Sequence, residues 1–97
     1  MEVQYDAQGR MKYSYSQEQL NAGDIVSVTL DSEANVLLLD SSNYSRFKRG
    51  QRYNYFGGLA KSSPARIKVP RSGLWYIVIN LGGYAGKVNY SVNIIRN

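Results

Sequence analysis

Apolar and polar residues alternate with a period of two in several stretches of this chain, and this feature constrains the fold most. Residues 88–94 show it most clearly, with polar residues standing between Val88, Tyr90, Val92 and Ile94. Successive side chains of a β-strand point to opposite faces of the sheet. The pattern therefore predicts a strand with one buried face.

The same reasoning predicts further strands over residues 11–16, 25–30, 51–56, 65–69 and 74–79. Residues 36–39 are apolar at every position, which is typical of a strand covered on both faces. Gly57-Gly58 is expected to end the strand over 51–56. With turn signals about every 8–12 residues, about seven short strands are expected, and the predicted fold is a small all-β antiparallel sandwich.

One short helical turn is predicted near residues 42–49. Asp40, Ser41, Ser42 and Asn43 are good N-cap residues, and Gly50 is a good helix stop. Tyr44 and Phe47 are three positions apart, so they would share one helical face.

A chain of 97 residues corresponds to a single domain, here residues 1–97, and little order is expected in residues 1–10. The chain has no apolar run long enough to cross a membrane as a helix, and its N-terminus does not resemble a secretory signal. These features, together with the lack of cysteine, agree with a cytoplasmic location and predict no membrane contact.

The sequence contains neither histidine nor cysteine. It therefore lacks the usual general base, the thiol nucleophile and the commonest transition-metal ligands. The acidic group Asp31-Ser32-Glu33 does not have the spacing of a calcium-binding loop and is interpreted as a turn. We expect no catalytic residue, no metal and no cofactor.

Charge is divided unevenly along the chain. Residues 1–40 carry seven acids and two bases, whereas residues 41–97 carry ten bases and no acid. The imbalance suggests an anionic partner. The structural alternative, which is somewhat favoured for a sandwich, is that the acidic half folds against the basic half and neutralises it.

The candidate binding segment is residues 53–61, which combines aromatic residues, paired glycines and a lysine. Glycines allow backbone N–H groups to approach a ligand, and cations attract an anion. With the neighbouring helical turn and its basic flank, the candidate ligand-binding residues are Tyr44, Arg49, Arg52, Tyr53, Tyr55, Phe56, Gly57, Gly58 and Lys61. The structural alternative, given at least even weight, is that the rings are core or edge residues and the glycines serve turn geometry.

A second glycine-rich loop covers residues 82–87 and adds Tyr84 as a candidate ligand contact. This loop lacks the spacing, the hydroxyl residue and the following helix of a phosphate-binding P-loop. A hairpin is therefore the preferred interpretation. Trp75, in an apolar strand, is expected in the core.

Several segments resemble a bacterial family catalogued as a domain of unknown function, DUF1883. They are residues 24–31, 34–40, 42–44, 53–61, 63–64, 69–75 and 81–88, so the resemblance covers most of residues 15–95. It implies a compact β-rich domain that occurs alone or beside a TIR domain in bacterial proteins. It implies no established activity and supplies no catalytic residues.

The residues leave several functions open. The preferred hypothesis is a non-catalytic binding or sensing module that recognises an anionic small molecule or protein partner. Single-stranded nucleic acid is an alternative, because tyrosines interleaved with basic residues can stack bases. A self-associating structural module is another, because exposed tyrosines favour interfaces. An enzyme is the weakest hypothesis.

Overall fold

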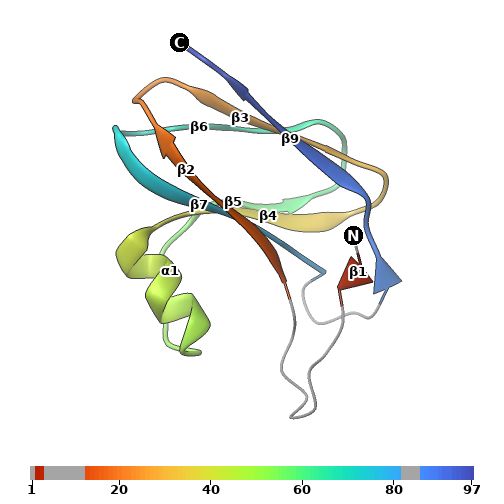
Figure 1. The fold of residues 1–97 in the computed structure, drawn as a ribbon. Coiled ribbons are helices and arrows are strands. Elements are labelled where there is room, and N and C mark those ends of the chain that lie inside the picture. Colours follow the sequence, from red (N-terminus) through yellow and green to blue (C-terminus); the bar gives the residue numbers. More distant parts are fainter. Residues whose placement is uncertain (1, 4–12, 82–85) are drawn as a thin grey trace.

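The computed structural model describes residues 2–3, 13–81 and 86–97, with the backbone alone at residues 2, 3, 86 and 87. The chain forms two stacked antiparallel sheets with one short helix (Figure 1). One sheet has the order β2 (Ser14–Leu20), β7 (Gly73–Asn80), β4 (Ala34–Asp40), β5 (Phe56–Ala60). The other has the order β6 (Ala65–Lys68), β3 (Ile25–Leu30), β9 (Tyr90–Ile95). The predicted all-β sandwich is confirmed.

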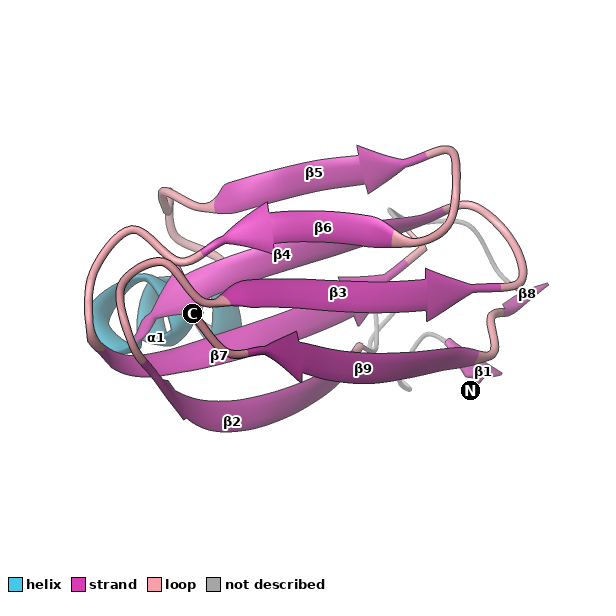
Figure 2. Cartoon of the chain, turned by 90° about the horizontal axis from the view of Figure 1, so that it is seen from above, coloured by secondary structure: helices cyan, strands magenta, loops and turns pink. Residues whose placement is uncertain are grey.

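Two short strands and the helix complete the fold. β1 (Glu2–Val3) pairs with β8 (Gly86–Lys87), and α1 (Ser41–Lys48) follows β4. Figure 2 shows the two layers and the helix on the far side of the four-stranded sheet. The expectation for residues 1–10 stays a prediction, because residues 1 and 4–12 lie outside the described part of the chain.

The main core lies between the two sheets. β3 contributes its alternating Val26, Val28 and Leu30, and Trp75 is 1% exposed within the same cluster. The expected core position of Trp75 is therefore confirmed. Burial of these side chains removes apolar surface from water at every level of the sandwich, which stabilises the stacking of the sheets.

A second, smaller core lies on the outer face of the four-stranded sheet. Val36 and Leu38 of β4 face the main core, whereas Leu37 and Leu39 face the helix side and pack with Tyr44 and Val78 there. The prediction that residues 36–39 form a strand covered on both faces is confirmed.

The helix begins and ends as its capping residues predict. The Asp40 carboxylate accepts a hydrogen bond of 2.8 Å from the backbone N–H of Asn43, and Gly50 adopts a positive φ of 72° after the last turn. The helix spans eight residues rather than a single turn.

The prediction of a strand over residues 51–56 was wrong. Residues 51–55 form no regular structure, and β5 begins at Phe56 and runs through Gly57 and Gly58. A Cβ atom at Gly57 would overlap the carbonyl oxygen of Val36 and lie 2.8 Å from Ile67 Cδ1. The glycine therefore permits a close approach of β5 to β4 inside the strand instead of ending it.

The prediction of a strand over residues 11–16 was correct only in part. Residues 11 and 12 lie outside the described residues, and β2 continues to Leu20. Residues 16–20 alternate in burial. Only Leu20 among them is a large apolar residue, so the sequence pattern does not reveal this part of the strand.

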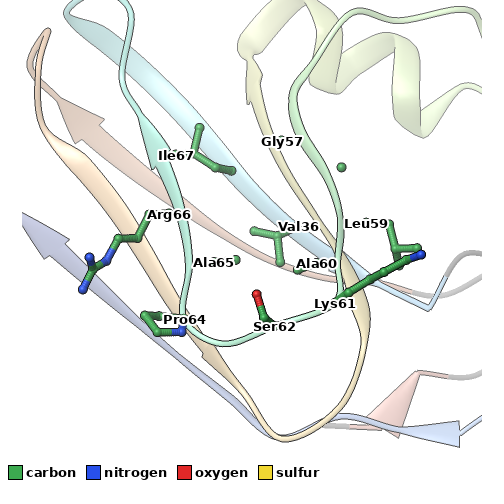
Figure 3. A pocket seen from close by; sticks show the side chains of 11 residues that line it. Val36, Gly57, Leu59, Ala60, Lys61, Ser62, Pro64, Ala65, Arg66 and Ile67 are labelled. Atoms are coloured by element: carbon green, nitrogen blue, oxygen red, sulfur yellow. The ribbon is translucent and has the colours of Figure 1, made fainter.

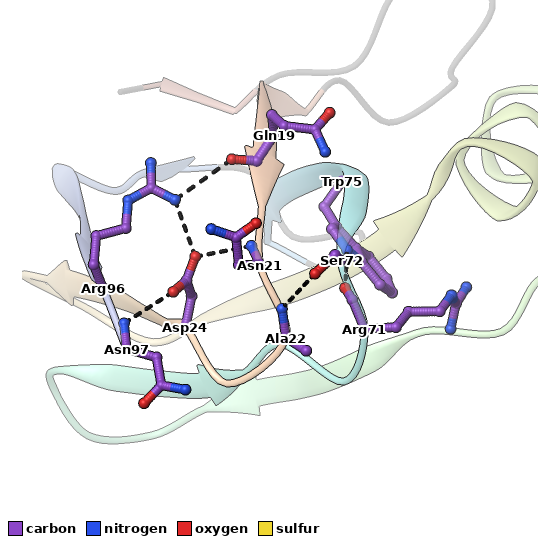
Figure 4. Close-up of polar contacts among 9 residues, drawn as sticks. All are labelled: Gln19, Asn21, Ala22, Asp24, Arg71, Ser72, Trp75, Arg96 and Asn97. Carbon is purple, nitrogen blue, oxygen red and sulfur yellow. Dashed lines mark hydrogen bonds and ion pairs between the residues drawn. The ribbon is translucent and has the colours of Figure 1, made fainter.

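The C-terminus is held by a buried carboxylate (Figure 4). Asp24 accepts hydrogen bonds from the backbone N–H groups of Asn21 at 2.9 Å and Asn97 at 3.0 Å, and it forms an ion pair of 3.0 Å with Arg96. These bonds, with the burial of the side chain opposing them, lower the pKa of Asp24. The end of β9 is thereby tied to the turn that precedes β3.

No helix in the described part of the chain is long and apolar enough to span a membrane.

Candidate functional site

Aromatic side chains gather on the outer face of the four-stranded sheet, around the helix. We call this set the aromatic cluster; its members are Tyr13, Tyr15, Tyr44, Phe47, Tyr53, Tyr55 and Tyr76. Each ring lies within 6.2 Å, centroid to centroid, of another ring in the cluster. The cluster joins β2, β7, the helix and the segment that follows the helix.

Tyr44 lies at the buried centre of the aromatic cluster. It is 5% exposed, its ring stacks on Tyr76, and its hydroxyl is 3.1 Å from that of Tyr13. Burial, followed by the hydrogen bond with Tyr13, raises the pKa of Tyr44. The ammonium of Lys48 lies over the Tyr44 ring, 5.1 Å from its centre, within the range of a cation–π contact.

Tyr53 and Tyr55 form the exposed end of the cluster. Tyr53 packs edge-on against Phe47, with ring centroids 5.2 Å apart, and Tyr55 follows with its ring 5.7 Å from that of Tyr53. Burial, followed by the influence of Tyr55, raises the pKa of Tyr53. Tyr55 is 49% exposed, so one side of this pair faces solvent.

A hollow of about 410 Å³ opens beside these two tyrosines. We call it the outer hollow; it is lined by Asn35, Leu37, Tyr53, Tyr55, Gly58, Leu59 and Asn80. Residues of β4, β5 and β7 contribute to its lining, and the tyrosines come from the segment between the helix and β5. Its volume matches that of a small-molecule site.

Two amide side chains supply polar groups to the outer hollow. Asn35 and Asn80 are paired in register between β4 and β7, and the Asn35 amide nitrogen donates a hydrogen bond of 2.9 Å to the Asn80 side-chain oxygen. Asn80 is only 3% exposed. The hollow thus combines apolar and aromatic walls with a fixed pair of amides, an arrangement suited to a planar or ring-bearing polar molecule.

The structure brings some predicted site residues together and separates others. Tyr53, Tyr55 and Gly58 line the outer hollow, whereas Gly57, Gly58 and Lys61 line a different hollow between β5 and β6. Phe56 lies edge-on to Trp75 with ring centroids 6.0 Å apart. Tyr44 lines neither hollow, and Tyr84 lies outside the described residues.

Arg49 and Arg52 are exposed and belong to the connection from the helix to Tyr53. Arg49 is the C-cap of α1, and Arg52 directly precedes Tyr53. Neither forms an ion pair in the described part of the chain. Both cations therefore remain available to an anion from solvent.

The two halves of the chain neutralise each other only in part. Arg71 pairs with Asp40 at 2.7 Å and Arg96 pairs with Asp24, so the basic half does meet the acidic half at these points. Within the described residues, the seven other bases between residues 46 and 71 form no ion pair: Arg46, Lys48, Arg49, Arg52, Lys61, Arg66 and Lys68. They are distributed over both layers, because the last two lie on β6 of the three-stranded sheet.

Sequence reasoning missed four residues that line the outer hollow: Asn35, Leu37, Leu59 and Asn80. A signal for two of them was present, since Asn35 and Asn80 are each an amide beside a run of apolar residues in a predicted strand. An amide placed among buried aliphatic residues needs a partner. Their pairing with each other depends on the strand order, which the sequence does not specify.

The described residues contain no group of three acidic side chains arranged to hold a metal ion. Asp31 instead accepts hydrogen bonds from the backbone N–H of Asn89 at 2.8 Å and from its side-chain amide at 2.7 Å. These bonds lower the pKa of Asp31 and connect the turn before β4 to the start of β9.

Comparisons with known proteins agree with the resemblance seen in the sequence. A search of curated proteins and a search of solved structures each returned no match. The family model described as "Domain of unknown function (DUF1883)" matches residues 11–97, which is nearly the whole chain and includes every strand of the two main sheets. The chain therefore belongs to the DUF1883 family.

Proposed function

We propose that this domain is a non-catalytic binding or sensing module whose outer hollow takes a small anionic molecule with a planar ring. The observation that carries the proposal is the hollow of about 410 Å³ beside the half-exposed ring of Tyr55 and the partly buried ring of Tyr53. Aromatic side chains bind planar rings by stacking, at little conformational cost to the protein.

The polar groups of the site support a ring with hydrogen-bonding edges. The paired amides of Asn35 and Asn80 stand in the lining, held by the bond between them. The Asn35 side chain, which this bond orients, can donate to or accept from the edge of a heterocycle with little further ordering cost.

Two cations that lie close to Tyr53 in the sequence support an anionic ligand. Arg49 and Arg52 precede Tyr53 in the chain, are exposed and have no acidic partner in the described residues. Guanidinium groups bind phosphate and carboxylate through paired hydrogen bonds. A nucleoside phosphate combines the ring, the polar edge and the anion, so it is the ligand class that these residues favour.

The experiment is a thermal-shift measurement with adenosine monophosphate, adenosine and inorganic phosphate. A ligand present at about ten times its Kd stabilises the folded state by about 1.4 kcal/mol, a shift of roughly 5–10 °C for a domain of this size. We expect the monophosphate to raise the melting temperature more than adenosine or phosphate alone. No shift with any of the three at millimolar concentration would refute this ligand class.

Matched variants locate the ligand. Tyr55→Ala removes a ring from the wall of the outer hollow, and we expect it to abolish the shift. Tyr15→Ala is the control, because Tyr15 is equally exposed, at 53%, and belongs to the same aromatic cluster but does not line the hollow. Equal loss of the shift in both variants would mean that the ligand binds elsewhere.

Single-stranded nucleic acid is the competing ligand, since the rings of Tyr53 and Tyr55 lie 5.7 Å apart and could stack bases. Nucleic-acid binding falls steeply with salt because counterions are released. A gel shift at low ionic strength that disappears at moderate salt, without any thermal shift from the mononucleotide, would favour this alternative.

We further propose, following the family resemblance, that the module acts in the bacterial cytoplasm, alone or beside a TIR domain.

A further inference from the structure

The free edge of β5 offers a second recognition site beside the outer hollow, with which it shares Gly58 and Leu59. β5 is the last strand of its sheet and pairs with β4 on one side, and no strand in the described part of the chain pairs with its other side. An edge strand presents unpaired backbone N–H and C=O groups. These groups can be satisfied by an extended chain that adds to the sheet.

A groove runs beside this edge, where the two sheets of the sandwich come together (Figure 3). β5 and β6 are consecutive strands that belong to different sheets, and a hollow of about 310 Å³ lies between them. Ile67 contributes apolar surface to the groove, the buried Val36 lies beneath it, and the remaining lining is mostly small: Gly57, Gly58, Ala60, Ser62 and Ala65. These small residues leave the space between β5 and β6 open, whereas large side chains fill the space between the sheets in the main core.

The two glycines of β5 have different surroundings. At Gly57 a side chain would collide with the carbonyl oxygen of Val36 and with Ile67 Cδ1, so the backbone lies directly against β4 and the Ile67 side chain. At Gly58 an added Cβ would meet nothing within 4 Å, so the strand is bordered by open space there. A backbone that approaches Gly58 from this side would therefore find open space.

The side chains around the edge favour a partner that is both apolar and acidic. Tyr55, Phe56 and Leu59 are 49%, 44% and 55% exposed, an unusual amount of apolar surface for one short segment. Lys61 directly follows β5, extends on the same side as Leu59, and points away from the groove (Figure 3). Lys61 and Arg66 flank the groove, and neither has an ion pair within the described residues.

We infer that an extended acidic segment of another protein adds to β5 as a fifth strand of its sheet. Side chains of the added strand would alternate, with apolar residues entering the groove toward Val36 and Ile67, and carboxylates pointing outward beside Lys61. A second copy of this chain fits less well, because it would bring a net charge of +5 and the same unpaired cations to a positively charged edge.

The probe is a fluorescein-labelled peptide of about eight residues in which aspartate and valine alternate, compared with one of lysine and valine. We expect fluorescence anisotropy to show saturable binding of the acidic peptide, weakened by salt, and none of the basic peptide. Hydrogen exchange should slow at the amides of β5 when the acidic peptide is bound, because a paired edge protects them.

Two charge reversals of equal size test the position of the peptide. Lys61→Glu is expected to weaken binding at least about fivefold, and Lys68→Glu at most about twofold, since Lys68 is exposed on β6 but does not line the groove. Both residues are exposed, so both variants should fold.

Three results would overturn the inference. The acidic peptide could fail to bind at millimolar concentration, Lys61→Glu and Lys68→Glu could weaken it equally, or the β5 amides could exchange as fast with the peptide as without it. Sedimentation velocity of the protein alone adds a fourth test. A dimer that protects β5 without peptide would assign the edge to a second copy instead.

Discussion

The rings of Tyr44 on α1 and Tyr76 on β7 stack face to face, with centroids 4.0 Å apart and planes 8° from parallel. Both belong to the smaller core, together with Leu37, Leu39 and Val78. This contact attaches the helix to the outer face of the four-stranded sheet by apolar and ring packing. Because the segment that carries Tyr53 and Tyr55 follows the helix, the same attachment fixes the position at which this segment begins.

Removing the Tyr44 ring should therefore loosen the helix. We expect Tyr44→Ala to lower the free energy of unfolding by about 3 kcal/mol, because a buried aromatic side chain is replaced by a cavity. Tyr44→Phe keeps the stack and loses the hydroxyl with its hydrogen bond to Tyr13, so we expect a loss of about 1 kcal/mol. Urea denaturation measures both, and equal losses in the two variants would contradict a dominant role of ring packing.

Gly57 should be the least replaceable glycine of the described turns and strands. Its φ is +102°, and a Cβ there would collide with the backbone of Val36. We expect Gly57→Ala to cost about 3 kcal/mol, the sum of backbone strain and displacement of β4. Gly50→Ala is the control, because Gly50 also has a positive φ but an added Cβ meets nothing within 4 Å.

Gly50→Ala should cost only about 1 kcal/mol, the backbone penalty alone. Chemical denaturation of the two variants under identical conditions measures the difference. A cost for Gly57→Ala no larger than that of Gly50→Ala would show that β5 can move away from Val36 at little expense.

The predictable parts of this fold are those with a strong local pattern. The strands over residues 25–30 and 36–39 are predicted correctly because the first has an apolar residue at every second position from Val26 and the other is apolar throughout. The helix was located by Asp40 and Gly50, which satisfy its end groups through local contacts. In each case, residues close together in the sequence are enough to determine the element.

The parts that could not be predicted depend on contacts between distant segments. Gly57 was expected to end a strand, and its role is set by Val36, a residue of another strand. Tyr44 was proposed as a ligand contact, but Tyr76 of β7 covers its ring. The outer hollow exists because β4 and β7 are neighbours and bring Asn35 to Asn80, an order that no local pattern specifies.

Asp40 should contribute to the stability of the fold in two ways, as the N-cap of the helix and as the partner of Arg71. Burial opposes its ionisation, but hydrogen bonds from Asn43 and the charge of Arg71 outweigh it and lower the pKa of Asp40. We expect Asp40→Ala to cost about 1–2 kcal/mol in urea denaturation, because the cap is lost. Asp40→Asn keeps an acceptor for the Asn43 N–H and should cost less, and the reverse order would contradict a capping role.

Asp24 should make the stability of the protein depend on pH. Hydrogen bonds from the backbone of Asn21 and Asn97, with Arg96, hold the pKa of Asp24 in the folded state below its ordinary value of 3.8. The unfolded chain therefore binds a proton at Asp24 more readily than the folded chain. The contribution of Asp24 to stability is fully present above about pH 5 and is lost as the pH falls through the folded pKa.

The variant Asp24→Asn isolates this effect. We expect it to be less stable than the parent protein near neutral pH, and the difference in unfolding free energy should shrink as the pH falls below 3.8. Glu33→Gln is the control, because Glu33 is exposed and makes no hydrogen bond or ion pair in the described structure, so its removal should change stability little. Urea denaturation of all three proteins between about pH 7 and pH 3 gives the comparison. A stability difference for Asp24→Asn that stays constant across this range would mean that Asp24 acts through packing alone, and the charge-dependent attachment of Asn97 and Arg96 would have to be abandoned.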